Sequence, residues 1–218
     1  MALVVAYNVA EFTGKKTVAT NAEVVAQVEK TDGRKQRSVR SRDKIKSSII
    51  TLIRGGNYSP RAIDISEHSG LSMRTVFRHI DDMESLLREI AGDLQKEMLP
   101  QFLQPYSATD WRKQLDEQIS RRAKTWEYVL PIRLSASLRR FQSKFLLEEY
   151  SQLLELERAS LKAVLPKELV ADDVLFAAVN EAVGVGCWIS LRVDQGLSPE
   201  GAEAVLRRTV YALIDTAV

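Results

Sequence analysis

The most informative segment of the chain is Ser59 to Ile80, SPRAIDISEHSGLSMRTVFRHI. Its pattern predicts two short helices separated by a tight turn. We expect Ser59 to cap the first helix, because its hydroxyl can accept a hydrogen bond from a free backbone amide, and Pro60 suits a first turn that needs no amide. Gly70 can adopt a positive φ without steric cost, and Ser72 can then cap the second helix.

The second helix predicted here has two different faces. Val76 and Ile80 are one turn apart and are expected to face inward, which leaves the other side chains to point away from the core. A helix that presents short polar, basic and aromatic groups beyond a glycine turn is typical of the recognition helix of a helix-turn-helix. The expected contacts to double-stranded DNA are Arg40, Arg42, Ser59, Ser72, Met73, Arg74, Thr75, Phe77, Arg78 and His79.

The segment Ile65–Leu87 resembles the DNA-binding signature of the tetracycline-repressor (TetR) family, and the resemblance extends back to Ile45. The chain departs from that signature at three positions. Phe77 replaces a tyrosine and Met83 a lysine, so the phosphate contacts of those residues are not carried over, whereas Arg74 stands where a glycine is common. The resemblance implies a homodimeric transcriptional regulator, usually a repressor, that a small-molecule effector releases from a palindromic operator.

The charge of the chain is unevenly distributed. Residues 33–80 contain eleven Lys and Arg against three Asp and Glu, whereas residues 81–218 contain seventeen against twenty-two. This asymmetry indicates a basic surface for a polyanion joined to an acidic remainder. One cysteine, Cys187, excludes an intrachain disulfide, and with no secretion signal we expect a cytoplasmic, nucleoid-associated protein.

Three domains are predicted, with a flexible extension over residues 1–37, a helix-turn-helix domain over 38–88 and an effector-binding and dimerisation domain over 89–218. Within the extension, Asn21–Lys30 could form at most one marginal helix. Six cations lie between Gly33 and Lys44, and they suit either a solubilising linker or an arm that follows DNA phosphates.

Beyond the basic segment the apolar period stays helical, so the predicted fold is all-α with about nine helices. Pro100 and Pro105 are expected to stop the fourth helix. Thr109 is expected to cap the next one, and Pro131 to open another. The later helices are predicted over 142–165, over 172–193 and from Pro199 to about Thr216, the last with Ser198 as its cap.

Residues 174–193 are apolar enough to suggest a membrane span, but Asn180 and Glu181 near the middle argue against one, because a charge at the bilayer centre costs roughly 2.5 kcal/mol or more. We therefore expect no membrane partner. This segment could instead form a core helix of a monomer or a helix of a dimer interface, and the resemblance favours the dimer interface. The interface residues it implies are Ala178, Ala182, Val185, Gly186, Trp188, Ile189, Leu206 and Val210.

The middle helices, where the resemblance implies an effector pocket, contain Trp111, Trp126, Tyr128, Arg133, Phe141 and Tyr150. Arg133 could pair with an anionic effector. No catalytic residue, cofactor motif or metal-ligand spacing appears, since the two histidines lie in the helix-turn-helix and Cys187 lies in an apolar stretch. An all-α enzyme or an interaction module that kept the fold without binding an operator is the alternative.

Overall fold

The computed structural model describes residues 21–80 and 83–216, which are helices and connections with no strand. The predicted all-α fold of about nine helices is confirmed for these residues. The chain divides into two compact units, residues 1–41 and 42–218.

The described part of the first unit is helical. It belongs to α1 (Asn21–Arg54), which differs from the expected flexible extension over residues 1–37. Within this unit the guanidinium of Arg37 donates to the carbonyl of Gly33, and the hydroxyl of Ser41 donates to the carbonyl of Arg37. A short helix is marginal alone, but residues that extend an existing helix avoid the cost of nucleation. Residues 1–20 lie outside the described part.

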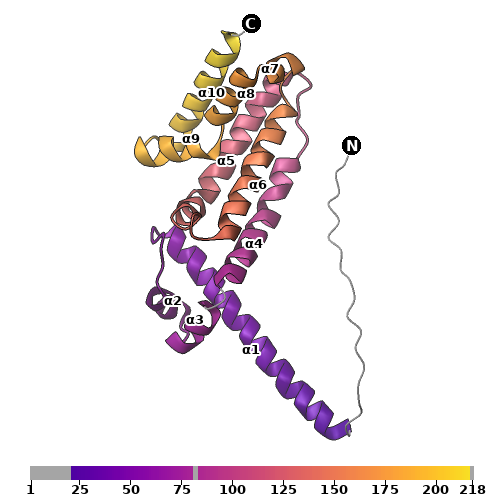
Figure 1. Ribbon diagram of the computed structural model, residues 1–218, viewed down its shortest axis with the longest axis vertical. Coiled ribbons are helices and arrows are strands. Elements are labelled where there is room, and N and C mark those ends of the chain that lie inside the picture. Colours follow the sequence, from indigo (N-terminus) through magenta and orange to yellow (C-terminus); the bar gives the residue numbers. More distant parts are fainter. Residues whose placement is uncertain (1–20, 81–82, 217–218) are drawn as a thin grey trace. The chain divides into compact units, whose positions relative to one another are not determined.

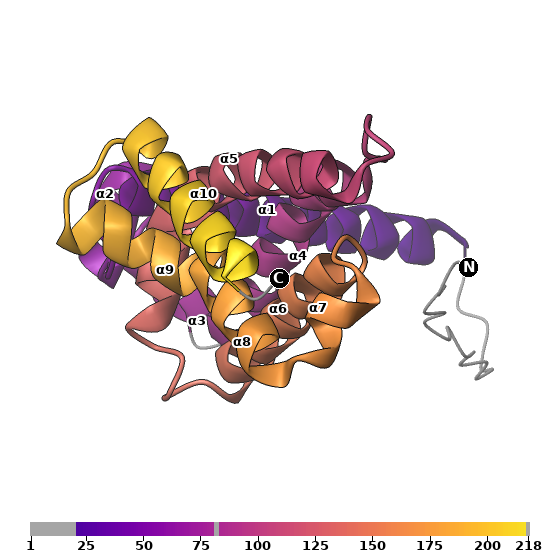
Figure 2. The same cartoon turned by 90° about the horizontal axis from the view of Figure 1, so that it is seen from above.

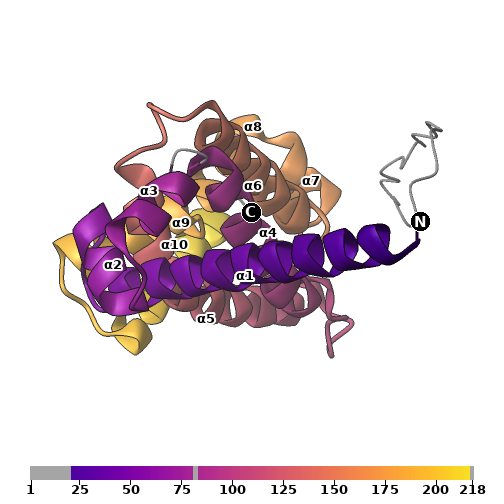
Figure 3. The same cartoon turned by 90° about the horizontal axis from the view of Figure 1, so that it is seen from below.

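The second unit contains two hydrophobic cores. The first joins the end of α1 to α2 (Ala62–Ser69), α3 (Met73–Ile80) and the beginning of α4 (Met83–Leu103). We call these elements, residues 42–90, the head; Figure 3 views the unit from this end. The buried residues of the head core are Ile45, Ile49, Ile53, Ile65, Val76, Leu86 and Ile90.

The second core lies in the remainder of the unit, which we call the body (residues 91–216). Its elements are the rest of α4, α5 (Trp111–Ser137), α6 (Lys144–Lys162), α7 (Lys167–Ala171), α8 (Asp173–Ala182), α9 (Val185–Ile189), the π-helical turn η1 (Ser190–Asp194) and α10 (Pro199–Asp215). Helices α4, α5 and α6 run alongside one another, and α8 packs against α10 (Figures 1 and 2). Trp126, Phe176 and Trp188 are the largest apolar side chains fully buried in this core.

Two prolines predicted to end or begin helices lie inside them. Pro100 is within α4, which continues to Leu103, and Pro131 is within α5, which is one helix to Ser137. A proline inside a helix costs about 3 kcal/mol, because it removes a hydrogen bond and clashes with the preceding turn. Packing on both sides of Pro131 outweighs this cost, since Trp126 is buried in the body core and Ile132 packs against the head core.

Two predicted helix caps are displaced along the chain. The N-cap of α2 is Arg61 rather than Ser59, because the carboxylate of Asp64 accepts the backbone N–H of Arg61 at 2.8 Å. The N-cap of α5 is Asp110 rather than Thr109, and its carboxylate accepts the N–H of Lys113 at 3.1 Å. Asp is at least as good a cap as Thr, so the neighbouring carboxylate prevails. Ser198 caps α10 as predicted.

The helix predicted over residues 172–193 is interrupted. Helix α8 ends at Ala182, Gly184 has an extended backbone with φ −75° and ψ 160°, and α9 follows from Val185. By length and composition alone, the apolar segment Asp173–Asp194 is long enough to cross a membrane, but it is partly buried inside the protein. The interruption belongs to the packing of the body core, because side chains of other helices meet the backbone there.

A buried polar cluster explains the interruption. Arg122 of α5 donates to the carbonyls of Val183 (3.2 Å) and Glu157 (2.5 Å) and to the hydroxyl of Ser160 (2.8 Å). The carboxylate of Glu157 lies so close to Gly184 that a Cβ there would come within 3.2 Å of it. Glycine therefore permits the approach, and Arg122 satisfies a carbonyl that the interrupted helix leaves without its regular partner.

Candidate nucleic-acid interface and ligand pocket

The predicted turn between α2 and α3 is present in the structure. Gly70 has φ 68°, in the left-handed region that favours glycine, and its N–H donates to the carbonyl of Ser66 at 3.1 Å. The hydroxyl of Ser66 donates to the carbonyl of Leu71 at 2.6 Å. At the start of α3 the backbone N–H of Thr75 donates to Ser72, to its carbonyl at 2.8 Å and more weakly to its hydroxyl. These bonds fix the direction in which α3 leaves the turn.

Helix α3 has one buried and one exposed face. Val76 is fully buried in the head core, whereas Arg74 and Arg78 are exposed and the ring of Phe77 is 51% exposed. In the part of the chain that the structure describes, neither arginine forms an ion pair. Met73 and Thr75 are half-buried beside them. The exposed face thus offers two guanidinium groups and an aromatic ring on a rigid helix.

His79 is a correction to the expected interface. It was expected to point away from the core, but its side chain is only 6% exposed. Its pKa is lowered by burial first and then by the positive charges of Arg78 and Arg42, so the imidazole is held neutral. Val76 and His79 are three positions apart and are the two buried residues of α3. Only Val76 and Ile80 were assigned to the inward face from the sequence, and the burial of His79 was therefore missed.

Three other expected contacts differ in how they are held. Arg40 is exposed and belongs to the first unit. Arg42 is engaged within the second unit, where its guanidinium donates to Glu89 at 2.6 Å and Ser85 at 2.8 Å, both on α4. The hydroxyl of Ser59 accepts a hydrogen bond from Arg139 at 3.1 Å. Arg42 therefore ties α1 to α4, and Ser59 ties the segment before α2 to the turn after α5.

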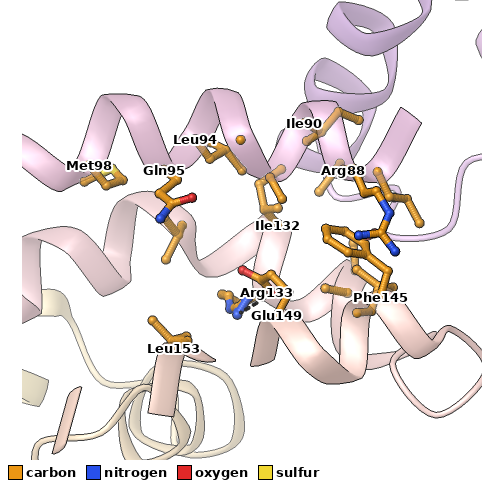
Figure 4. A pocket seen from close by; sticks show the side chains of 18 of the residues that line it. Arg88, Ile90, Leu94, Gln95, Met98, Ile132, Arg133, Phe145, Glu149 and Leu153 are labelled. Atoms are coloured by element: carbon orange, nitrogen blue, oxygen red, sulfur yellow. Dashed lines mark hydrogen bonds and ion pairs between the residues drawn. The ribbon is translucent and has the colours of Figure 1, made fainter. Parts of the chain in front are cut away.

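A cavity of about 330 Å³ lies between the head core and the body core. Helices α1, α2, α4, α5 and α6 all contribute to its wall, and the side chains are mainly apolar (Figure 4). On the head side the wall contains Ile49, Ile53 and Ile65. A largely apolar cavity with a few polar groups is the usual form of a small-molecule site.

One ion pair is embedded in the wall of this cavity. The guanidinium of Arg133 donates to one carboxylate oxygen of Glu149 at 2.7 Å from Nη1 and 3.2 Å from Nη2 (Figure 4). Arg133 was expected to pair with an anionic effector, and the chain already supplies its anion. The other polar groups nearby include the amides of Gln95 and Gln152.

The structure places two of the six predicted pocket residues in the wall, Trp126 and Arg133. The other four lie elsewhere, as their partners indicate. Trp111 packs against the body core, the hydroxyl of Tyr128 donates to Glu97, Phe141 is 79% exposed, and Tyr150 lies beneath Arg140. Aromatic type alone was therefore a poor guide to the wall.

The wall residues that were missed come mainly from α4 and α6. Ile90, Leu94 and Met98 follow one another at helical spacing along α4, and Phe145 and Leu153 lie on α6. The spacing along the fourth helix was a usable signal for an apolar face, but it did not distinguish a face that fills a core from one that borders a cavity. That distinction depends on the opposite helices.

Most of the residues expected at a dimer interface are buried inside one chain. Trp188 is 0% exposed and its indole N–H donates to Glu127 of α5 at 3.2 Å. Ala182, Val185, Leu206 and Val210 are also buried, so these five are corrected to core residues of the protomer. Ala178 and Ile189 are half-buried, and Gly186 is exposed. Because the helix is interrupted at Gly184, the small residues expected to form one exposed face lie partly in the core.

A different set of small and apolar residues is exposed on α8 and α10. On α10 the exposed positions recur at helical spacing, and α8 carries a similar set. The exposed residues on these two helices include Val174, Ala177, Glu181, Ala204, Val205, Arg208, Thr209 and Ala212. Val174 is 82% exposed, which is high for a valine. We call this set the outer α8/α10 face.

Comparisons with protein-family models, curated proteins and solved structures returned no match for this chain. Within the described residues, no group of three or more His, Cys, Asp or Glu side chains is placed to hold a metal ion.

Proposed function

We propose that this protein is a DNA-binding transcriptional regulator whose α3 enters the major groove. The observation that carries the proposal is the exposed face of α3, where Arg74, Phe77 and Arg78 project beyond a left-handed glycine turn. Arg74 lies near the beginning of α3 and Arg78 in its last turn, and exposed guanidinium groups on such a helix suit guanine edges and phosphates. The excess of positive charge over residues 33–80 and the resemblance of Ile65–Leu87 to the TetR signature support the same function.

The regulator is proposed to act as a homodimer on a pseudo-palindromic operator, most often as a repressor. The outer α8/α10 face suits a two-fold contact, because most of its side chains are small or apolar and its two charged residues, Glu181 and Arg208, have opposite signs and could pair between subunits. Two recognition helices would then reach successive major grooves about 34–36 Å apart. A small molecule in the cavity would shift this arrangement and so release the DNA.

Selection of bound sites from a random duplex pool tests the proposal directly. A regulator of this kind enriches a palindromic site, and its affinity for random duplex falls steeply as salt rises. An all-α enzyme or interaction module that kept the fold would enrich no sequence and would show no salt-dependent binding to random duplex. That outcome would refute the proposal that the protein binds DNA.

Arg74→Ala is expected to weaken operator binding by about 1–3 kcal/mol and to relax the preference at one base pair. The reason is that an arginine can donate two hydrogen bonds to a guanine edge, which no alanine can replace. Competition binding with operator and random duplex measures both effects. Equal losses on the two duplexes would instead identify Arg74 as a phosphate contact.

Removal of residues 1–37 is expected to reduce the slope of log affinity against log salt. The deletion removes three cations of the basic segment, Arg34, Lys35 and Arg37, and the slope falls by about 0.9 for each phosphate that a cation no longer neutralises. Titration of operator binding at several salt concentrations gives the slope. An unchanged slope would show that this segment does not touch the duplex.

A further inference from the structure

We infer that the cavity between the two cores takes an uncharged, mainly apolar small molecule, and that this molecule contacts the head directly. The first part concerns the chemistry of the cavity alone. The second part, that such contact regulates DNA binding, rests on the proposed function.

The argument about charge begins with the Arg133–Glu149 pair in the wall. A ligand anion placed against Arg133 would also lie against Glu149, and a ligand cation placed against Glu149 would also lie against Arg133. Either charge would lose its hydration on entering an apolar cavity and gain little from a pair that is already neutral. The amides of Gln95 and Gln152 can still donate and accept hydrogen bonds to uncharged polar groups.

Two further charged side chains, Arg88 and Arg139, line the wall, and the partner of Arg88 is a carboxylate whereas that of Arg139 is a hydroxyl. Arg88 donates to Glu84 at 2.9 Å and lies over the ring of Phe145 at 4.3 Å. Arg139 donates to Ser59. Arg88 is more than half exposed, so it borders the cavity from the solvent side. Apart from these two arginines and the Arg133–Glu149 pair, the wall contains only uncharged groups, which are apolar side chains, the amides of Gln95 and Gln152 and the hydroxyls of Thr125 and Ser135. This mainly apolar lining selects against a charged ligand.

The argument about the head rests on which residues share the wall. Ile49, Ile53 and Ile65 belong to the head core and also line the cavity. Ile132 of α5 lines the cavity from the body and packs against the head core. A ligand among these four side chains touches both parts at once, so its affinity depends on how the head is held. Because this coupling is reciprocal, binding of the ligand changes the stability of the head's position against the body by the same free energy.

A pair of fluorescent probes tests the charge preference on the full chain. N-phenyl-1-naphthylamine and 8-anilinonaphthalene-1-sulfonate share an aromatic body and differ by one sulfonate. We expect the neutral probe to bind at least tenfold more tightly. Ala91→Phe, which fills the wall on α4, should weaken its binding at least tenfold, whereas Ala159→Phe on the exposed side of α6 should leave it unchanged. Equal or tighter binding of the sulfonate, or equal effects of the two variants, would overturn the inference.

Amide hydrogen exchange with and without the neutral probe tests the contact with the head, and it needs no DNA. We expect slower exchange in residues 45–54 and 62–69 as well as in the body. Protection confined to the body would overturn this part. A final titration asks whether the probe changes operator affinity for the wild type and not for Ala91→Phe. A chain that binds the probe with protected head amides but binds no duplex would refute the proposed function and leave the cavity assignment standing.

Discussion

Replacing Arg122 with methionine should lower the free energy of unfolding by about 3–5 kcal/mol at pH 8, and by clearly less at pH 5. Arg122 is 1% exposed, and so is Glu157 beside it. Methionine keeps most of the volume but leaves a buried carboxylate without its cation, and it removes the donors to Val183 and Ser160. Chemical unfolding at the two pH values measures the loss.

The pH dependence follows from the protonation of Glu157. Burial raises its pKa to about 7, and the charge of Arg122 opposes that rise. Above its pKa in the unfolded chain, near 4.3, the folded protein holds more protons than the unfolded one, so stability falls as pH rises. Loss of Arg122 raises the pKa of Glu157 further, so the stability of the variant continues to fall up to a higher pH than that of the wild type. At pH 5 the carboxyl is protonated in the folded protein, and the missing cation costs less.

A double variant separates charge from packing. Arg122→Met with Glu157→Met removes both charges, and pairs of this kind are often replaced by apolar residues at little cost. We expect the double variant to recover most of the loss at pH 8 and to show no decline between pH 5 and pH 8 that depends on this site. Equal losses for Arg122→Met at both pH values would show that Glu157 does not titrate in this range.

Val205→Arg should dissociate the proposed dimer and reduce operator affinity by roughly a thousandfold. A two-fold contact repeats each substitution, so two cations would be brought together beside the two copies of Arg208. Burying an unpaired charge costs about 3–5 kcal/mol, and about 4 kcal/mol corresponds to a thousandfold change in a dissociation constant. Sedimentation and operator titration measure the two effects. Val205 is 36% exposed in the chain, so the fold itself has room for the change.

Leu154→Arg is the matched control, because Leu154 is a similarly exposed apolar residue on α6 and does not belong to the outer α8/α10 face. It should leave both assembly and operator binding unchanged. Ala182→Arg would be a poor test, since Ala182 is buried in the body core and the variant would disturb folding. A wild-type chain that is monomeric at tens of micromolar and still binds a palindrome tightly would contradict the dimer.

Features that depend on neighbouring residues could be predicted from the sequence. The all-α fold, the glycine turn at Gly70 and the Ser198 cap of α10 were all readable, because helical period and capping act over a few positions. The separation of charge between residues 33–80 and the rest was readable too, since it is a property of composition. The inward position of Val76 followed from the same local period.

Features that depend on contacts between residues far apart in the chain could not be predicted from the sequence. Trp188 is a core residue because Glu127, 61 positions away, accepts its indole N–H, and Arg133 is neutralised by Glu149 on another helix. Pro131 remains inside α5 because packing on both sides outweighs its local cost. A period along one helix shows that a face is apolar, but the helix opposite determines whether that face fills a core, lines a cavity or stays exposed.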